Sequence, residues 1–168
     1  GDPTLSPFST IEDGEFFKHL ELGWVSSYER RYLDNVHLTA WHTDEREEAG
    51  IPDGWGLAFS AAKFVDDEWM PFLRAGYAEG DASLLSHSVS AGVGRLFGGT
   101  NDLLGIGLNW GQPADDSLDD QWTSELFYRF QAAQNFAITP SIQLIGNPAL
   151  NPDKDFLAYF GLRARMTF

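Results

Sequence analysis

Hydrophobic and polar residues alternate with a period of two along most of the chain, and the spacing of an amphipathic helix is hard to find. Such alternation is typical of β-strands whose two faces meet different surroundings. The expected strands have roughly 9–13 residues each, more than the roughly 5–6 residues of strands in soluble sheets, and enough to cross a bilayer when tilted. We predict nine of them, over residues 17–28, 33–43, 55–64, 69–79, 85–96, 103–111, 121–131, 136–145 and 156–168.

The connections between these strands are predicted to alternate in length. Short connections are expected near residues 29–32, 65–68, 97–102 and 132–135. Longer polar connections are expected at residues 44–54, 79–84, 112–120 and 146–155. Short turns at one end and longer loops at the other are typical of outer-membrane barrels, whereas a soluble β-sandwich, the main alternative fold, has no such asymmetry. We therefore predict an all-β fold, an antiparallel transmembrane β-barrel, with a single domain over residues 1–168.

The two faces of each expected strand differ in polarity, most clearly in the last one. Phe160 and Leu162 lie on one face of that strand, and Arg163 and Arg165 lie on the other. Because an arginine in lipid at the bilayer midplane costs ~2–4 kcal/mol, the arginine face is predicted to line a wet interior. Aromatic residues gather near the strand ends, as they do at membrane–water interfaces. They are Trp24, Trp55, Trp69, Tyr77, Trp110, Trp122, Phe136 and Phe168.

Two features predict that these strands belong to a wider barrel. Nine is an odd number, whereas complete bacterial barrels have an even number of strands. The inner faces of the strands at 85–96 and 103–111 are small, with residues such as Ser88, Gly92 and Gly105. An eight-stranded barrel fills its interior with side chains, so this wall suits a wide channel or an inserted loop. We expect the C-terminal portion of a porin of about 16 strands.

The charge of the chain excludes some partners and leaves others open. There are 11 Lys and Arg against 25 Asp and Glu, a formal net charge of −14, and no Cys. A nucleic-acid partner is excluded because a polyanion requires a basic footprint. Without Cys there is neither a disulfide nor a thiolate metal site. Most acidic residues fall in the loops, where they either solvate the loop tips or bridge through Ca²⁺ or Mg²⁺ to lipopolysaccharide phosphates.

Residues that could support catalysis are not arranged for it. His37 and His42 are five residues apart, so on one strand they face opposite sides and cannot share a metal. Adjacent Ser86 and His87 are separated by the same alternation, which defeats a nucleophile–base pair. The glycine pairs lack the third glycine and the helix of a nucleotide-binding loop. We therefore predict no enzyme, no catalytic residue, no metal site and no cofactor, with a barrel enzyme as an alternative.

Several stretches resemble one known family. They are ELGW (21–24), SYERRYLDNVHLTAWHTDEREEAGIPDGWG (27–56), NDLLGIGLNWGQP (101–113), ELFYRFQ (125–131), AITPSIQLIGNPALNPDKD (137–155) and FGLRARMTF (160–168). Together they resemble the C-terminal half of the carbohydrate-selective outer-membrane porin family, whose members are sugar-uptake porins often called glucose porins. NPALNPDKD followed by FGLRARMTF is the most specific block. The sequence departs from the family at its N-terminus, where the upstream strands are missing.

The resemblance implies passive, energy-independent diffusion of carbohydrates such as monosaccharides across the cell outer membrane of a Gram-negative bacterium. The implied partners are a carbohydrate substrate, outer-membrane lipid and lipopolysaccharide, and either a homo-oligomer such as a trimer or the upstream half of the same barrel. A general diffusion porin and a soluble ligand-binding β-sandwich are the alternatives. The candidate lumen-lining, substrate-binding residues with inward phase are Trp41, Arg74, Glu125, Arg129, Arg163 and Arg165. The other interpretation of such residues is charge pairing within the lumen, for example of Glu125 with Arg129.

Overall fold

Nine strands form one antiparallel sheet in chain order in a computed structural model that describes residues 14–46, 50 and 52–167. The strands are β1 (Phe17–Val25), β2 (Asn35–Thr43), β3 (Gly54–Ala62), β4 (Trp69–Glu79), β5 (Leu85–Phe97), β6 (Asp102–Pro113), β7 (Gln121–Ala133), β8 (Phe136–Gly146) and β9 (Phe156–Met166). The predicted all-β antiparallel fold is confirmed. Within the described part of the chain, no helix is long and apolar enough to cross a membrane.

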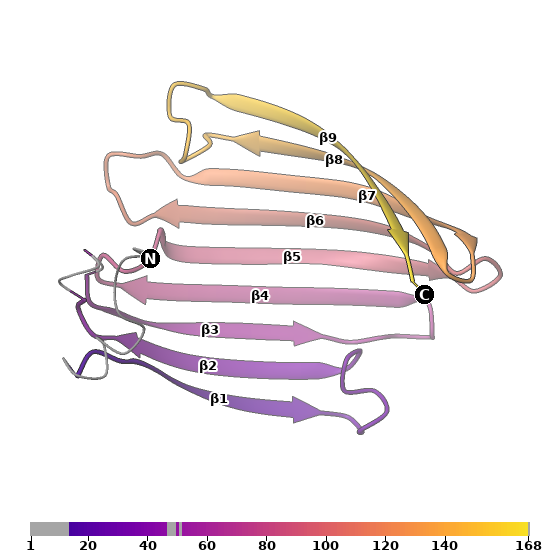
Figure 1. Cartoon of the computed structure of the whole chain (residues 1–168), viewed down its shortest axis with the longest axis horizontal. Helices are drawn as coiled ribbons and strands as arrows, with labels where there is room; N and C mark the ends of the chain where they lie inside the picture. Colours follow the sequence, from indigo (N-terminus) through magenta and orange to yellow (C-terminus); the bar gives the residue numbers. More distant parts are fainter. Residues whose placement is uncertain (1–13, 47–49, 51, 168) are drawn as a thin grey trace.

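The sheet is a single curved layer. Its strands lie side by side from β1 to β9, and β9 swings forward over the hollowed face (Figure 1). β1 and β9 are the two edges, because each is hydrogen-bonded to one neighbour only, so the sheet is not closed within the described residues. We call the hollowed side the concave face and the other side the convex face.

The strand register explains why the alternating sequence gives two different faces. Ile106, Leu126, Ile142 and Phe160 are consecutive partners across β6 to β9, and they form one apolar row on the convex face. One residue along each strand, the next row carries Gly107, Glu125, Gln143 and Tyr159 on the concave face. Since side chains of a strand alternate between the faces, this division of apolar from polar continues along the sheet, with exceptions such as Phe72 on the concave face and Arg95 on the convex face.

The convex face stays exposed. Phe160 is 82% exposed and Leu162 is 77% exposed, and among the described residues the buried hydrophobic side chains are only Ala78 and Ala137. Predicted aromatic residues meet near the loop end of this face, where the ring centroids of Trp110 and Trp122 lie 6.4 Å apart. The sheet therefore buries almost no apolar side chain between layers, in contrast to a β-sandwich.

Most predicted strand ends agree with the structure within two residues, but the first predicted strand, 17–28, ends at Val25. Residues 26–34 form a turn in which Arg30 Nε lies 2.6 Å from Asp34 Oδ2, and Asp34 Oδ1 accepts the Phe64 N–H at 2.7 Å. The Arg30 guanidinium and the Phe64 amide hold the pKa of Asp34 well below its usual range.

These contacts make the first turn longer than predicted. Its nine residues exceed the five of the 80–84 connection at the opposite end, so the predicted alternation of short and long connections is wrong at these two places. Three residues of the predictions lie outside the described part of the chain. Phe168 was predicted among the aromatic residues near strand ends, and Glu47 and Glu48 belong to the polar connection predicted at 44–54.

Candidate functional site

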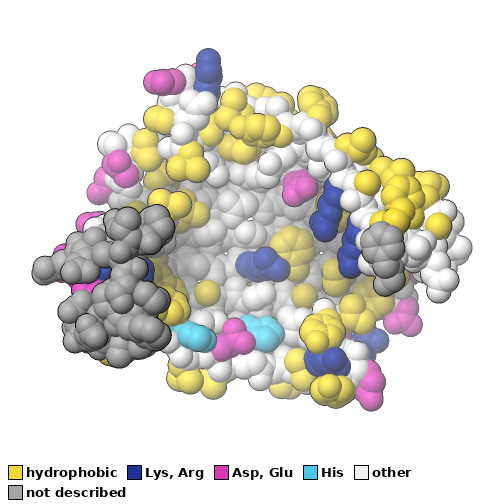
Figure 2. Space-filling model, viewed as in Figure 1, with side chains coloured by type: hydrophobic (Ala, Val, Ile, Leu, Met, Phe, Trp, Pro, Cys, Tyr) yellow, Lys and Arg dark blue, Asp and Glu magenta, His cyan; other side chains and the backbone are white. Residues whose placement is uncertain are grey.

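The concave face gathers the charged side chains that the sequence predicted to line a lumen. Figure 2 looks onto this face, where arginine or lysine, acidic and histidine side chains lie in the hollow and apolar side chains crowd its rim. The predicted residues Trp41, Arg74, Glu125, Arg129, Arg163 and Arg165 all share this face by strand register.

Three arginines and a carboxylate line one hollow at the β7–β9 side of this face. Arg129 comes from β7, and Arg163 and Arg165 come from β9, with a hollow of about 320 Å³ between them. The intervening strand β8 carries Ala137 opposite Arg165 and Thr139 opposite Arg163. Because these β8 side chains are small, the longer arginine side chains of both neighbouring strands can reach over them.

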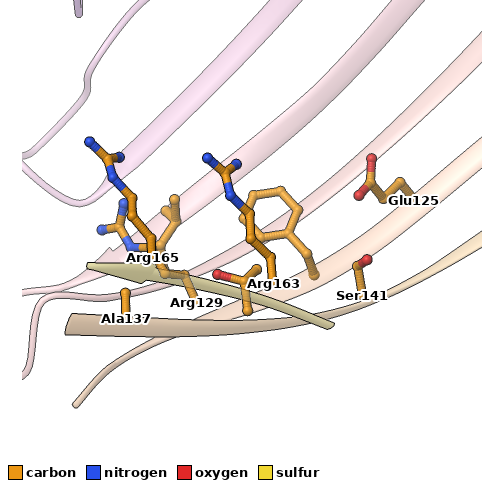
Figure 3. A pocket seen from close by; sticks show the side chains of 9 residues that line it. Glu125, Arg129, Ala137, Ser141, Arg163 and Arg165 are labelled. Atoms are coloured by element: carbon orange, nitrogen blue, oxygen red, sulfur yellow. The ribbon is translucent and has the colours of Figure 1, made fainter. Parts of the chain in front are cut away.

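Glu125 lines the same hollow but stands apart from the arginines. In Figure 3, Arg129, Arg163 and Arg165 project from the sheet on the same side, and Glu125 lies farther along it. Arg129 is four positions beyond Glu125 along the extended strand, which corresponds to about 13 Å of strand length. Within the described residues no ion pair joins these two side chains. The pairing considered from the sequence is therefore absent, because both residues face inward but too far apart.

Trp41 and Arg74 lie elsewhere on the concave face. Trp41 stands near the loop end of β2, where its ring is stacked with Phe17 at a centroid distance of 6.2 Å. Arg74 is in β4 opposite Ser60 and Ser90, with its guanidinium carbon 5.8 Å from the centre of the Phe72 ring. The structure thus brings four of the six predicted residues together and leaves these two at separate positions on the same wall.

Aromatic rings packed over glycines are a feature that the sequence reading missed. Trp41 lies directly opposite Gly56, Phe72 opposite Gly92, and Phe127 opposite Gly105 in neighbouring strands. A Cβ added at Gly56 would meet the Trp41 ring at 2.6 Å, and one at Gly92 would meet the Phe72 ring at 2.5 Å. The small inner residues predicted to widen the channel therefore also make room for rings against the wall.

Polar groups away from the arginine hollow are linked by hydrogen bonds. Glu21 accepts the Thr39 hydroxyl at 3.1 Å and lies 3.0 Å from His37 Nδ1. The Asn109 amide donates to the hydroxyl of Ser90 at 2.8 Å. No group of three or more His, Asp or Glu among the residues that the structure describes is arranged to hold a metal ion. Carboxylates, amides, hydroxyls, guanidinium groups and aromatic rings together suit a polyhydroxylated molecule, since sugars offer both hydroxyls and an apolar ring face.

Comparison with known families agrees with this geometry. A model of the carbohydrate-selective porin, OprB family matches residues 36–168, which include strands β3 to β9 and all of β2 except its first residue. No curated protein and no solved structure matches the chain. Porins of this family are outer-membrane proteins of Gram-negative bacteria, and the match points to a transport channel rather than an enzyme. The chain belongs to the carbohydrate-selective porin, OprB family.

Proposed function

We propose that this chain forms the wall of an outer-membrane channel through which carbohydrates of monosaccharide size diffuse passively. The observation that carries the proposal is the opposition of the two faces. Phe160 and Leu162 on the convex side of β9 are largely exposed, whereas Arg163 and Arg165 stand on its concave side. In water such an apolar surface is unfavourable, but in lipid it is the ordinary exterior of a barrel. The outer membrane of a Gram-negative bacterium is therefore the proposed location.

The proposed substrate class rests on the concave face and on the family. Guanidinium, hydroxyl and carboxylate groups, such as those of Arg163, Ser141 and Glu125, can bind sugar hydroxyls, and the rings of Trp41 and Phe127 can pack on the apolar side of a pyranose. Selectivity would come from this lining rather than from the acidic loops. Transport needs no energy source, because the concentration gradient drives it.

The working channel needs partners for both sheet edges. β1 and β9 expose unpaired backbone groups, which hydrocarbon cannot satisfy. We propose that further strands close the barrel, that lipid and lipopolysaccharide contact the convex face, and that complete barrels associate as trimers.

Conductance of the complete channel in a planar bilayer tests the proposed function. We expect open channels whose current falls as glucose is raised through the millimolar range, because bound sugar obstructs the ions. Sucrose at the same concentrations serves as the control for viscosity, since a disaccharide is too large to enter a monosaccharide site. Conductance that glucose and sucrose affect equally would leave a general diffusion porin, and absence of conductance would contradict the channel.

A further inference from the structure

The arginine cluster of the concave face, Arg129, Arg163 and Arg165, has no carboxylate partner within the described residues. Arg30 and Arg95 do have such partners, since Arg30 pairs with Asp34 at 2.6 Å and Arg95 lies 3.6 Å from Glu68, whereas Arg31 and Arg74 form no ion pair within the described residues either. What distinguishes Arg129, Arg163 and Arg165 is that three such arginines line one hollow in a chain with a formal charge of −14. Three cations without an ion pair in the described part of the chain therefore stand together, although acidic side chains are abundant in the sequence.

The carboxylates nearest to the cluster along the strands form no ion pair with it, although Asp102 lies near enough to experience the positive charge of Arg129. Asp102, opposite Phe97 at the start of β6, accepts the Tyr128 hydroxyl at 2.8 Å and the Gln131 N–H at 2.8 Å. Glu125 lies about 13 Å along β7 from Arg129. Among the residues that the structure describes, the one hydrogen bond of these guanidinium groups is from Arg129 to the backbone oxygen of Asn101, at 3.2 Å. Arg163 and Arg165 donate no hydrogen bond to the described part of the chain, so their donors are available to water or to a solute.

The register places the three guanidinium groups around one spot. Arg163 is paired with Thr139, and Arg165 is paired with Ala137, so these two stand on neighbouring rows of the concave face. Arg129 stands across β8 from them and lines the same hollow of about 320 Å³, a size within the range of roughly 300–1,000 Å³ for small-molecule sites. Like charges this close repel one another, and an anion between them would remove the repulsion.

We propose that this arginine cluster binds the anionic substituent of an acidic sugar, a carboxylate or a phosphate, as the sugar passes. The proposal rests on the proposed channel function and narrows its substrate class. Guanidinium groups match the oxygens of both anions with paired hydrogen bonds, which a neutral hydroxyl cannot match. Glu125 at the far side of the hollow repels the anion and accepts hydroxyl donors, so it orients the sugar with its charged end toward the arginines.

Block of the complete channel by a series of solutes tests this proposal. The solutes are glucose, glucuronate, glucose 6-phosphate and acetate, each titrated at about 0.1 M ionic strength, where screening extends over about 10 Å. We expect half-block by glucuronate or by glucose 6-phosphate at a concentration at least tenfold below that of glucose, and no block by acetate. The two acidic sugars distinguish a carboxylate preference from a phosphate preference.

A triple variant assigns the effect to the cluster. Arg129→Gln, Arg163→Gln and Arg165→Gln together should reduce the preference for acidic sugars over glucose to about one. Arg31→Gln, in the turn before β2, removes a guanidinium outside the hollow and should leave the preference unchanged. If the triple variant does not fold, the three single variants, each expected to lower the preference, take its place.

The outcomes separate this proposal from the proposed function. Glucose block without a preference for acidic sugars overturns the anion site and leaves the sugar channel standing. Block by acetate as strong as by glucuronate overturns recognition of a sugar, because any anion then suffices. A preference that survives the triple variant places the site elsewhere and overturns the assignment. Absence of block by every sugar contradicts the sugar channel itself.

Discussion

Alanine at Gly92 is expected to destabilise the folded channel, whereas alanine at Gly107 is not. The two glycines are direct partners in β5 and β6 and share the concave face, so they form a matched pair. A Cβ at Gly92 would lie 2.5 Å from the backbone oxygen of Ile106 and 2.5 Å from the Phe72 ring. At Gly107 the nearest atom is Phe72 Cζ at 3.7 Å, an ordinary contact.

The magnitude follows from these contacts. Relief at Gly92 requires a shift of about 0.9 Å, from 2.5 Å to the 3.4 Å at which ordinary contacts begin, in both a strand backbone and a ring. Overpacking of this kind costs about 1–3 kcal/mol, and alanine regains about 0.5–1 kcal/mol relative to glycine in a strand. We expect a net loss of about 1–2 kcal/mol for Gly92→Ala and a gain of up to about 1 kcal/mol for Gly107→Ala.

Urea titration of the complete channel in lipid vesicles measures both effects. The chain's six Trp residues report unfolding by fluorescence, and gel mobility of unheated samples reports the folded fraction. In the double variant Gly92→Ala/Phe72→Leu, a smaller side chain replaces the ring, and part of the lost stability should return. The recovery is only partial because the contact with the Ile106 carbonyl remains. Equal midpoints for Gly92→Ala and Gly107→Ala would refute the packing of the Phe72 ring over Gly92.

Three further predictions concern the faces, the lumen and the first turn. Ile142→Arg on the convex face should cost ~2–4 kcal/mol of folding stability. Gln143→Arg, at the next position of β8 and opposite Glu125 on the concave face, should cost far less. Similar losses of stability in the two variants would contradict the assignment of the faces. Arg163→Ala with Arg165→Ala should weaken glucose block without moving the urea midpoint, whereas loss of the folded barrel would make these residues structural. The Arg30 guanidinium and the Phe64 amide lower the pKa of Asp34, so its ionised carboxylate contributes fully to folding stability above about pH 4. This contribution is lost as the pH falls through the folded-state pKa of Asp34. The midpoint difference between the original channel and Asp34→Asn should therefore shrink in acid, and a difference constant from pH 7 to pH 2 contradicts this role.

The fold was predictable because its main signal is local. Alternation along β9 separates Phe160 and Leu162 from Arg163 and Arg165 without any knowledge of neighbouring strands. The length of the first turn was not predictable, because it depends on Asp34 accepting the Phe64 amide from a distant part of the chain. The alternation within each strand therefore predicts which residues share a face and roughly where the strand ends. Long-range hydrogen bonds such as that of Asp34 determine the length of the first turn.

The candidate site was predictable only as a set of inward residues. Inward phase identified Arg129, Arg163 and Arg165, but their meeting over β8 depends on the register of three strands. The same register places Phe127 opposite Gly105, a pair that the alternation within each single strand does not predict. Glu125 and Arg129 show that inward phase alone does not predict contact, since the two residues share the concave face and form no ion pair within the described residues.

Cysteine accessibility in the open channel tests most directly whether the concave face lines the sugar path. The chain has no native Cys, so single cysteines at positions 138, 139, 141 and 142 of β8 are unambiguous reporters. A water-soluble thiol reagent should react at 139 and 141 and reduce the current, glucose should slow both reactions, and positions 138 and 142 should stay unreactive in lipid. Equal reaction at all four positions, or reaction at 138 and 142 alone, would contradict a sugar channel lined by this face.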